Sequence, residues 1–197
     1  KQKTDNQYLR ALVFQLYERN GVIKRSEIDN IVKLIPTNDR KKLWGMGIKI
    51  GRYHVYLPKM LKPKAVEFRI SLWNLFHNLS GKNSIPKSGL NFLVDAKLEK
   101  NFLLLCGFEK FKEFFVRIDI LEKLFIKILD KSKDRKFKIN AEMMNLLGCT
   151  KENFYKLMTY MDYKKDKEED TYIFKGEKKK PKKFIKFDKK ENPFKKL

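Results

Sequence analysis

Hydrophobic residues recur every three or four positions over residues 7–21 and again over residues 26–35, which predicts two helices that each bury one face. Pro36 ends the second of these helices, and a short third helix is expected from about residue 38 to residue 44. Hydrophobic and polar residues then alternate on both sides of Gly51-Arg52, which is typical of two strands joined by a tight turn. The first sixty residues therefore predict three helices followed by a β-hairpin.

The middle of the chain contains one clear helical pattern and one mixed stretch. The helix is expected to begin near Pro63 and to end at Gly81. Residues 90 to 118 suit a strand and a helix equally well, and "FFVRI" is their best strand candidate. The stripe expected to be buried on the helix consists of Val66, Ile70, Trp73 and Phe76.

A further helix is expected to begin at Asp119, because Asp119 and Glu122 have the spacing of a capping box. The stretch "FKINAEMMNLLGCTKENFYKLMTYMDY" then has the pattern of helix, turn and helix, with Gly148 at the turn. "DTYIFKGE" can supply a returning strand. A helix pair joined at a glycine also occurs in helical proteins that bind no nucleic acid, so this helix-turn-helix pattern leaves the function open.

The order of elements at both ends of the chain is that of a winged-helix module. We therefore predict an α+β fold, mainly α with small β-hairpins, in which two winged-helix-like modules are joined by a helical segment. The predicted divisions are a first module at 1–60, a connecting helix and mixed segment at 61–118, a second module at 119–175 and a basic low-complexity tail at 176–197.

The charge of the chain is strongly unbalanced, since 46 Lys and Arg residues face 24 Asp and Glu residues, for a net charge of +22. Such a field favours a polyanionic partner, above all nucleic acid. The Lys-rich composition also matches the codon bias of an AT-rich genome, and that alternative stays open. The final stretch, residues 175–197, holds eleven Lys against three acidic residues, which predicts a flexible basic arm.

No pattern in the chain predicts catalysis, a cofactor or a metal site. Gly45, Gly47 and Gly51 lack the spacing and the Lys-Ser/Thr pair of a phosphate-binding loop, so they are expected to serve turns. His54, His77 and the two cysteines lack the spacing of a catalytic dyad or a metal site. With no signal peptide and no run long enough to span a bilayer, we expect a soluble, cytoplasmic protein without a membrane partner.

Three stretches in sequence resemble the region after the motor domains of a group of bacterial superfamily 2 (DExH-type) helicases related to the mitochondrial degradosome RNA helicase. They are "LWGMGIKIGRYHVYLPKMLKPKAVEFRISLW", "GFEKFKEFFVRIDILEKL" and "LLGCTKENFYKLMTYMDYK". The resemblance covers about residues 7 to 175, and it departs at Glu109, where a basic residue is expected.

This resemblance implies that the chain is the C-terminal accessory region of an ATP-dependent helicase, with RNA as the implied substrate. ATP and Mg²⁺ would belong to motor domains of the same parent chain, which are absent here, so the chain alone is not expected to be an enzyme. The residues themselves do not separate RNA binding from DNA binding. Two alternatives remain, namely a stand-alone winged-helix DNA-binding transcriptional regulator and a protein-interaction module.

The expected partner is single-stranded nucleic acid, held without sequence preference by phosphate contacts and stacking. Arg52 is expected at an exposed hairpin tip, with pairing to an internal acid as the alternative, and the helix after Gly148 is expected to turn its polar side to solvent. The predicted contact residues are Arg52, Lys62, Lys64, Lys151, Asn153, Lys156, Lys178, Lys179, Lys180, Lys182 and Lys183.

Overall fold

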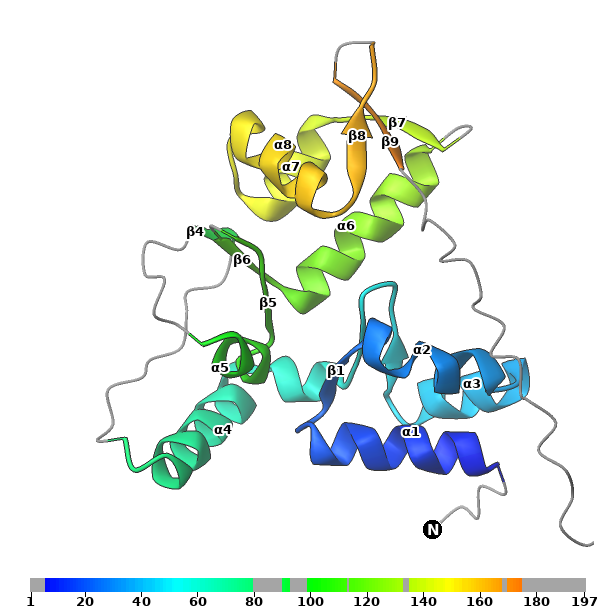
Figure 1. Ribbon diagram of the computed structural model, residues 1–197, viewed down its shortest axis with the longest axis vertical. Coiled ribbons are helices and arrows are strands. Elements are labelled where there is room, and N and C mark those ends of the chain that lie inside the picture. The colour runs from blue at the N-terminus through cyan, green and yellow to red at the C-terminus, as the bar shows by residue number, and fades with distance from the viewer. Residues whose placement is uncertain are drawn as a thin grey trace, which may run out of the picture.

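The computed structural model of the protein describes residues 6–79, 90–92, 99–112, 114–132, 135–167 and 170–174. Within these ranges the protein has an α+β fold with three small antiparallel sheets of three strands each (Figure 1), which confirms the predicted fold class in its coarse form. Lys178 to Lys183 and the rest of the predicted tail lie outside the described residues.

The first unit has the three helices and the hairpin predicted from its hydrophobic pattern, together with a strand, β1, that was not predicted. Leu9, Leu12 and Leu16 of its first helix pack with Val32 and Val55 in one buried cluster. The predicted hairpin is present, with Lys49 opposite Tyr56 and Ile50 opposite Val55. Its elements are α1 (Gln7–Glu18), β1 (Val22–Lys24), α2 (Arg25–Leu34), α3 (Thr37–Gly45), β2 (Lys49–Ile50) and β3 (His54–Tyr56).

The segment expected to connect two modules has a sheet and a hydrophobic cluster of its own. The cluster includes Phe102, Leu103, Phe108 and Phe115. "FFVRI", the best strand candidate, contains the central strand of this sheet. The elements are a 3₁₀ turn η1 (Pro58–Leu61), α4 (Pro63–Phe76), β4 (Leu90–Phe92), α5 (Lys100–Leu105), β5 (Phe108–Lys110) and β6 (Phe114–Arg117).

The third unit contains the predicted pair of helices joined at Gly148, which has the left-handed φ of +64° that glycine adopts readily. Thr150 then caps the next helix with its side-chain oxygen. The unit buries Phe154 and Leu157 against its own sheet and α6. Its elements are α6 (Ile118–Lys131), β7 (Lys136–Lys138), α7 (Ala141–Leu147), α8 (Lys151–Tyr160), β8 (Tyr163–Lys165) and β9 (Thr171–Phe174).

The expected capping box at the start of α6 is wrong. The helix begins one residue earlier, at Ile118, with Arg117 as its N-cap and no side-chain capping bond. Asp119 pairs with the guanidinium of Arg117 instead. Glu122 is buried and its carboxylate points away from the helix start, because it binds backbone groups of the first unit.

The same arrangement occurs three times along the chain. Each unit has a helix, a strand, one or two further helices and a final pair of strands among its described residues. In each sheet the last strand lies in the middle, since the strand orders are β1-β3-β2, β4-β6-β5 and β7-β9-β8. The middle segment is therefore built like its neighbours, whereas its sequence pattern predicted a connection.

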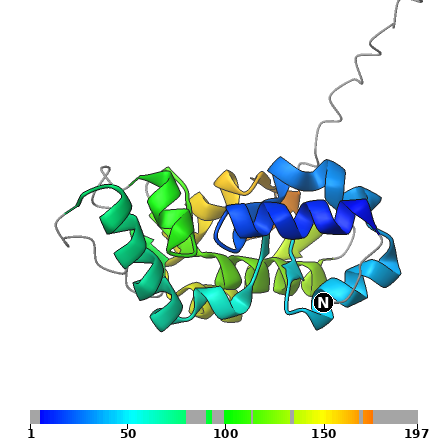
Figure 2. The ribbon, with the colours of Figure 1, turned by 90° about the horizontal axis from the view of Figure 1, so that it is seen from below.

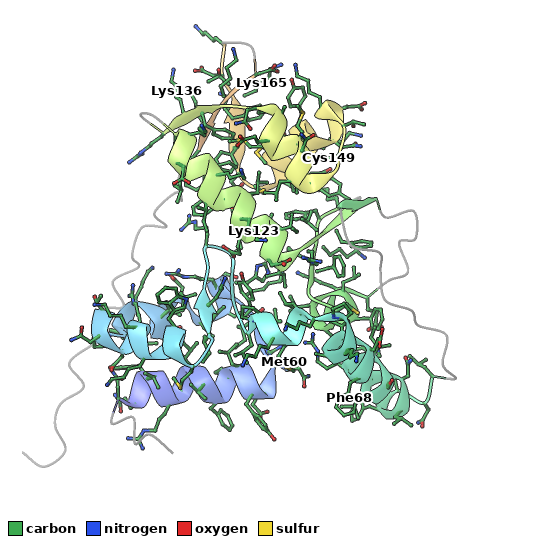
Figure 3. All side chains as sticks on the ribbon, turned by 180° about the vertical axis from the view of Figure 1, so that it is seen from behind. Met60, Phe68, Lys123, Lys136, Cys149 and Lys165 are labelled. Atoms are coloured by element: carbon green, nitrogen blue, oxygen red, sulfur yellow. The ribbon has the colours of Figure 1, made fainter. Side chains whose placement is uncertain are left out.

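Helix α4 leaves much of its apolar surface uncovered. Val66 and Ile70 are buried, together with Arg69, whose guanidinium donates to the carbonyl oxygens of Asn20 and Met60 and so ties α4 to the first unit. Phe76, expected in the buried stripe, is 83% exposed. Figure 2 shows α5 between α4 and α1, and Figure 3 shows α4, which carries Phe68, on the side of the molecule away from the third unit. The exposed apolar residues of α4 and the turn after it are Phe68, Leu72, Leu75, Phe76 and Leu79.

None of the helices in the described parts of the chain is long and apolar enough to cross a membrane. Both cysteines of the chain are free thiols, and burial raises the pKa of Cys106 to about 12. Cys106 therefore contributes to the apolar cluster of the second unit as a neutral side chain.

Candidate nucleic-acid interface

The hairpin of the first unit is held against α6 by one buried carboxylate. Glu122 accepts hydrogen bonds from the backbone N–H groups of Arg52 at 2.7 Å, Tyr53 at 2.8 Å and His54 at 2.9 Å. Three successive N–H donors around one anion form strong, charge-assisted contacts. The turn from strand β2 to strand β3 is thus fixed in place by a residue seventy positions away.

A second buried group of charges connects the first unit to the second. His54 is 1% exposed, and its Nε2 lies 2.9 Å from Oε2 of Glu109 on β5. Glu109 also forms an ion pair with Lys24 on β1. The Nδ1 atom of His54 lies 3.7 Å from Oε1 of Glu122. A basic residue was expected at position 109 from the resemblance to the helicases. Glu109 instead provides a carboxylate that pairs with Lys24 and His54 of the first unit.

These neighbours shift the pKa values of both buried groups. Burial by itself favours the neutral imidazole, but the carboxylates of Glu109 and Glu122 outweigh it and raise the pKa of His54. Burial also favours a protonated Glu109, but hydrogen bonds with His54 and Lys24 outweigh it and lower the pKa of that carboxyl. The geometry therefore favours an ion pair between His54 and Glu109.

Arg52 is not held out into solvent as its sequence context predicts. Its side chain is half-buried, with the guanidinium carbon 6.0 Å from the ring centre of Phe125 on α6 and 5.6 Å from that of Phe174 on β9. This geometry is that of a cation–π contact. Arg52 packs against these rings because Glu122 holds the turn that carries Arg52 on α6.

The predicted contacts on α8 are largely engaged within the third unit. Lys151 forms an ion pair with Asp170 at 2.6 Å, which raises the pKa of the lysine. Lys156 pairs with Glu152 at 3.6 Å, and Asn153 is half-buried. Figure 1 shows α6 between α8 and the first unit, so α8 and α3 lie on opposite sides of α6. Of the remaining predicted contacts, Lys62 and Lys64 are exposed at the start of α4.

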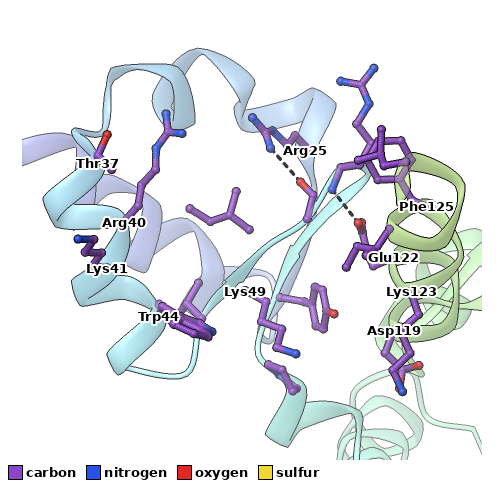
Figure 4. Close-up of a pocket in the computed structure, with 18 residues that line it drawn as sticks. Arg25, Thr37, Arg40, Lys41, Trp44, Lys49, Asp119, Glu122, Lys123 and Phe125 are labelled. Carbon is purple, nitrogen blue, oxygen red and sulfur yellow. Dashed lines mark hydrogen bonds between the residues drawn. The ribbon is translucent and has the colours of Figure 1, made fainter. Parts of the chain in front are cut away.

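A cleft of about 860 Å³ lies between the first unit and α6 (Figure 4). Its α3 wall carries Thr37, Arg40, Lys41 and Trp44. Arg40 and Lys41 each lie three or four positions from both Thr37 and Trp44, so the four residues share one side of the helix. Strand β2, at the edge of its sheet, borders the cleft between the two helices. The α6 wall is formed by Asp119, Glu122, Lys123, Phe125, Ile126 and Leu129.

The charged residues that line this cleft are mainly basic, and most of the remaining lining residues are apolar. The basic residues are Arg25, Arg40, Lys41, Lys49, Arg52 and Lys123. The two acidic residues of the lining are already bound, Asp119 to Arg117 and Glu122 to the hairpin turn.

The basic side chains of the cleft fall into two groups. Arg25 donates to the carbonyl oxygen of Gly51, and Arg40 donates to the carbonyl oxygens of residues 32 and 35 at the end of α2. Lys41, Lys49 and Lys123 are exposed, and none of them forms an ion pair within the described ranges. The arginines therefore shape the walls, while these three lysines, hereafter the cleft lysines, are available to an anion.

Aromatic and apolar surface adjoins the cleft lysines. Trp44 is 72% exposed, and Ile126 and Leu129 are each more than half exposed on the opposite wall. Neither Trp44 nor the cleft lysines were among the contact residues expected from the sequence. The spacing from Thr37 through Lys41 to Trp44 marks one face of α3, but no local pattern shows that α6 lies opposite that face.

A scan against protein-family models, a search of curated proteins and a search of solved structures each return no match. Among the described residues, no group of three or more His, Cys, Asp or Glu side chains is placed to hold a metal ion.

Proposed function

We propose that this chain is the nucleic-acid-binding accessory region of an ATP-dependent RNA or DNA helicase, and that it grips single-stranded nucleic acid without sequence preference. The observation that carries the proposal is the convergence of the cleft lysines on one cleft without acidic partners. Lysine ammonium groups bind phosphates as point charges, and each neutralised phosphate releases counterions. The net charge of +22 adds long-range attraction for the same polyanion.

The repeated order of elements supports the winged-helix part of the proposal. In the order of elements, α3 is the third helix of the first unit, and the third helix of a winged-helix module commonly meets nucleic acid. It is α3 that forms one wall of the cleft. In this proposal the first unit and α6 form the binding site, while the second and third units hold α6 in position.

The helicase part rests on the three resembling stretches, with motor domains of the same parent chain as the partner. A stand-alone winged-helix DNA-binding regulator is the alternative, which the same order of elements also favours. A regulator selects one DNA sequence over others, whereas the proposed grip binds strands of different sequence alike.

Charge reversal in the cleft tests the proposal. Binding of a fluorescein-labelled single strand is measured by anisotropy for the wild-type chain and for a variant with Lys41→Glu, Lys49→Glu and Lys123→Glu. A matched variant with Lys100→Glu, Lys138→Glu and Lys164→Glu has the same net charge, and its substitutions fall on exposed lysines outside the cleft.

The cleft variant should bind weakly, and its slope of log affinity against log salt should be shallower by about 2 to 3, because about 0.7 to 0.9 counterions are released per lysine contact. The control should keep most of its slope. Equal losses in the two variants would show that the cleft is not the site. Strong preference for one duplex sequence would favour the regulator.

A further inference from the structure

Trp44 is an unusual surface residue. It lies in the last turn of α3, where Leu43 is buried and the indole next to it is 72% exposed. A large aromatic side chain left in water gives up stabilisation that burial would provide. Trp44 also lies in the cleft rather than on a featureless surface, one helical turn after Lys41 and across from Lys123 (Figure 4).

The turn that follows Trp44 is open at its two glycines. A Cβ atom added at Gly45 or Gly47 would meet no described atom within 4 Å outside the adjacent residues and the backbone of α3. Gly47 has a φ of +83°, which lets the chain turn back into β2 without a side chain over the cleft. At these two positions the turn carries no side chain that would obstruct a planar ligand at the cleft.

We propose that Trp44 is a stacking platform for one unpaired base of the bound strand, with the neighbouring phosphates on the cleft lysines. This inference rests on the proposed function and names the contact that selects single strands. A base inside a duplex has both faces covered by its neighbours, so only an unpaired base offers a free face to the indole. Stacking is insensitive to base identity, which agrees with a grip that lacks sequence preference.

The charges around Trp44 favour a nucleotide over a purely apolar partner. Lys41, one helical turn before Trp44, and Lys49 on β2 line the same cleft, and both acidic residues of the cleft are bound elsewhere. A nucleotide combines a flat aromatic ring with an anionic group one sugar away. The cleft presents the complementary combination on α3 and β2.

Variants of Trp44 separate stacking from charge. Three labelled probes of equal length are compared by anisotropy: a mixed-sequence single strand, an abasic strand with the same phosphates, and a duplex. Trp44→Ala should weaken binding of the single strand by about 5- to 100-fold, which is the usual effect of removing one stacking platform. Binding of the abasic strand and the salt slope should not change, and Trp44→Phe should retain part of the affinity.

Phe76→Ala is the matched control, since Phe76 is 83% exposed and lies on α4, outside the cleft lining. It should bind all three probes like the wild type. A Trp73→Phe variant leaves Trp44 as the one remaining tryptophan of the chain's two. Its fluorescence should be quenched by the single strand and not by the abasic strand. Melting curves establish that each variant is folded.

The outcomes distinguish this inference from the proposed function. If the wild-type chain binds strands with a steep salt slope but Trp44→Ala matches it on every probe, the stacking proposal is wrong and the proposed function stands. An equal loss on the abasic strand would show that Trp44 only shapes the cleft, which also overturns stacking. Binding of polyglutamate that depends on Trp44 would mean that the site takes an acidic peptide. Absence of binding to every nucleic acid at low salt overturns the proposed function itself.

Discussion

Gly51 lies so close to Glu122 that the two positions constrain each other. A Cβ atom added to Gly51 would lie 2.3 Å from the carboxyl carbon of Glu122. The carboxylate occupies this space because it accepts the N–H groups of the three residues that follow Gly51. Gly51 lies in the turn expected from its sequence, but its φ is not left-handed, so the contact between units is what requires a glycine here.

This contact predicts that Gly51→Ala and Glu122→Ala are both destabilising and are coupled. Gly51→Ala should cost about 1–3 kcal/mol through overlap with the carboxylate. Glu122→Ala should cost at least about 1–3 kcal/mol by leaving buried N–H donors without a partner. The double variant should lose less than the sum, because the added methyl group no longer meets a carboxylate. Urea denaturation of the four proteins measures this; strict additivity would contradict the contact.

The pair of His54 and Glu109 predicts a stability maximum at mildly acidic pH. The raised pKa of His54 adds stability that is complete below its ordinary value of 6.5 and is lost as pH rises through the raised value. The lowered pKa of Glu109 adds stability that is complete above its ordinary value of 4.5 and is lost as pH falls through the lowered value. Both contributions are therefore complete between these two values.

Melting temperature measured against pH checks this expectation. His54→Gln keeps a hydrogen-bond donor for Glu109 but cannot titrate, so its melting temperature should fall less as pH rises above 6.5. The fall in melting temperature at acidic pH also has contributions from surface carboxyls whose pKa is lowered, such as Asp29. This fall should therefore be similar in the wild type and in His54→Gln. An identical fall in melting temperature above pH 6.5 in the two proteins would show that the charge of His54 does not stabilise its pair with Glu109.

Two residues on α4 with similar chemistry should differ sharply in their effect on stability. Ile70→Ala removes a side chain that is 5% exposed, and such changes cost about 2–5 kcal/mol. Phe76→Ala removes one that is 83% exposed and should leave the free energy of unfolding almost unchanged. Denaturant unfolding of the two variants measures the difference. A large loss with Phe76→Ala would mean that this side of α4 is covered in solution.

Removal of residues 176–197 should weaken binding and leave the fold intact. The removed segment carries ten of the chain's lysines and adds attraction for phosphates, while the buried clusters of the three units lie within residues 9–172. The expected result is an unchanged melting temperature with a weaker and less salt-dependent affinity. A marked drop in melting temperature would contradict the interpretation of this segment as a basic arm.

Local patterns were sufficient to predict the helices of the first and third units and the hairpin of the first unit, although not strand β1. Helical periodicity, Pro36 and the turn at Gly148 each act on neighbours within a few positions, so they are visible in the sequence. The elements within residues 61–118 were harder to predict from the sequence, because α5 has six residues and the strands beside it have three or four. Elements this short have too few residues to establish a period.

The sequence by itself determined the composition of this protein, its surplus of positive charge and the helices with strong periodicity, since these depend on residue types and on neighbours along the chain. Only the tertiary structure decided which charges remain available. Lys151 pairs with Asp170 and Arg52 packs on Phe125 and Phe174, whereas the cleft lysines have no acidic partner in the described ranges. The cleft itself exists because Glu122 fixes the hairpin on α6 across about seventy residues, and a contact over that separation leaves no periodic trace in the chain.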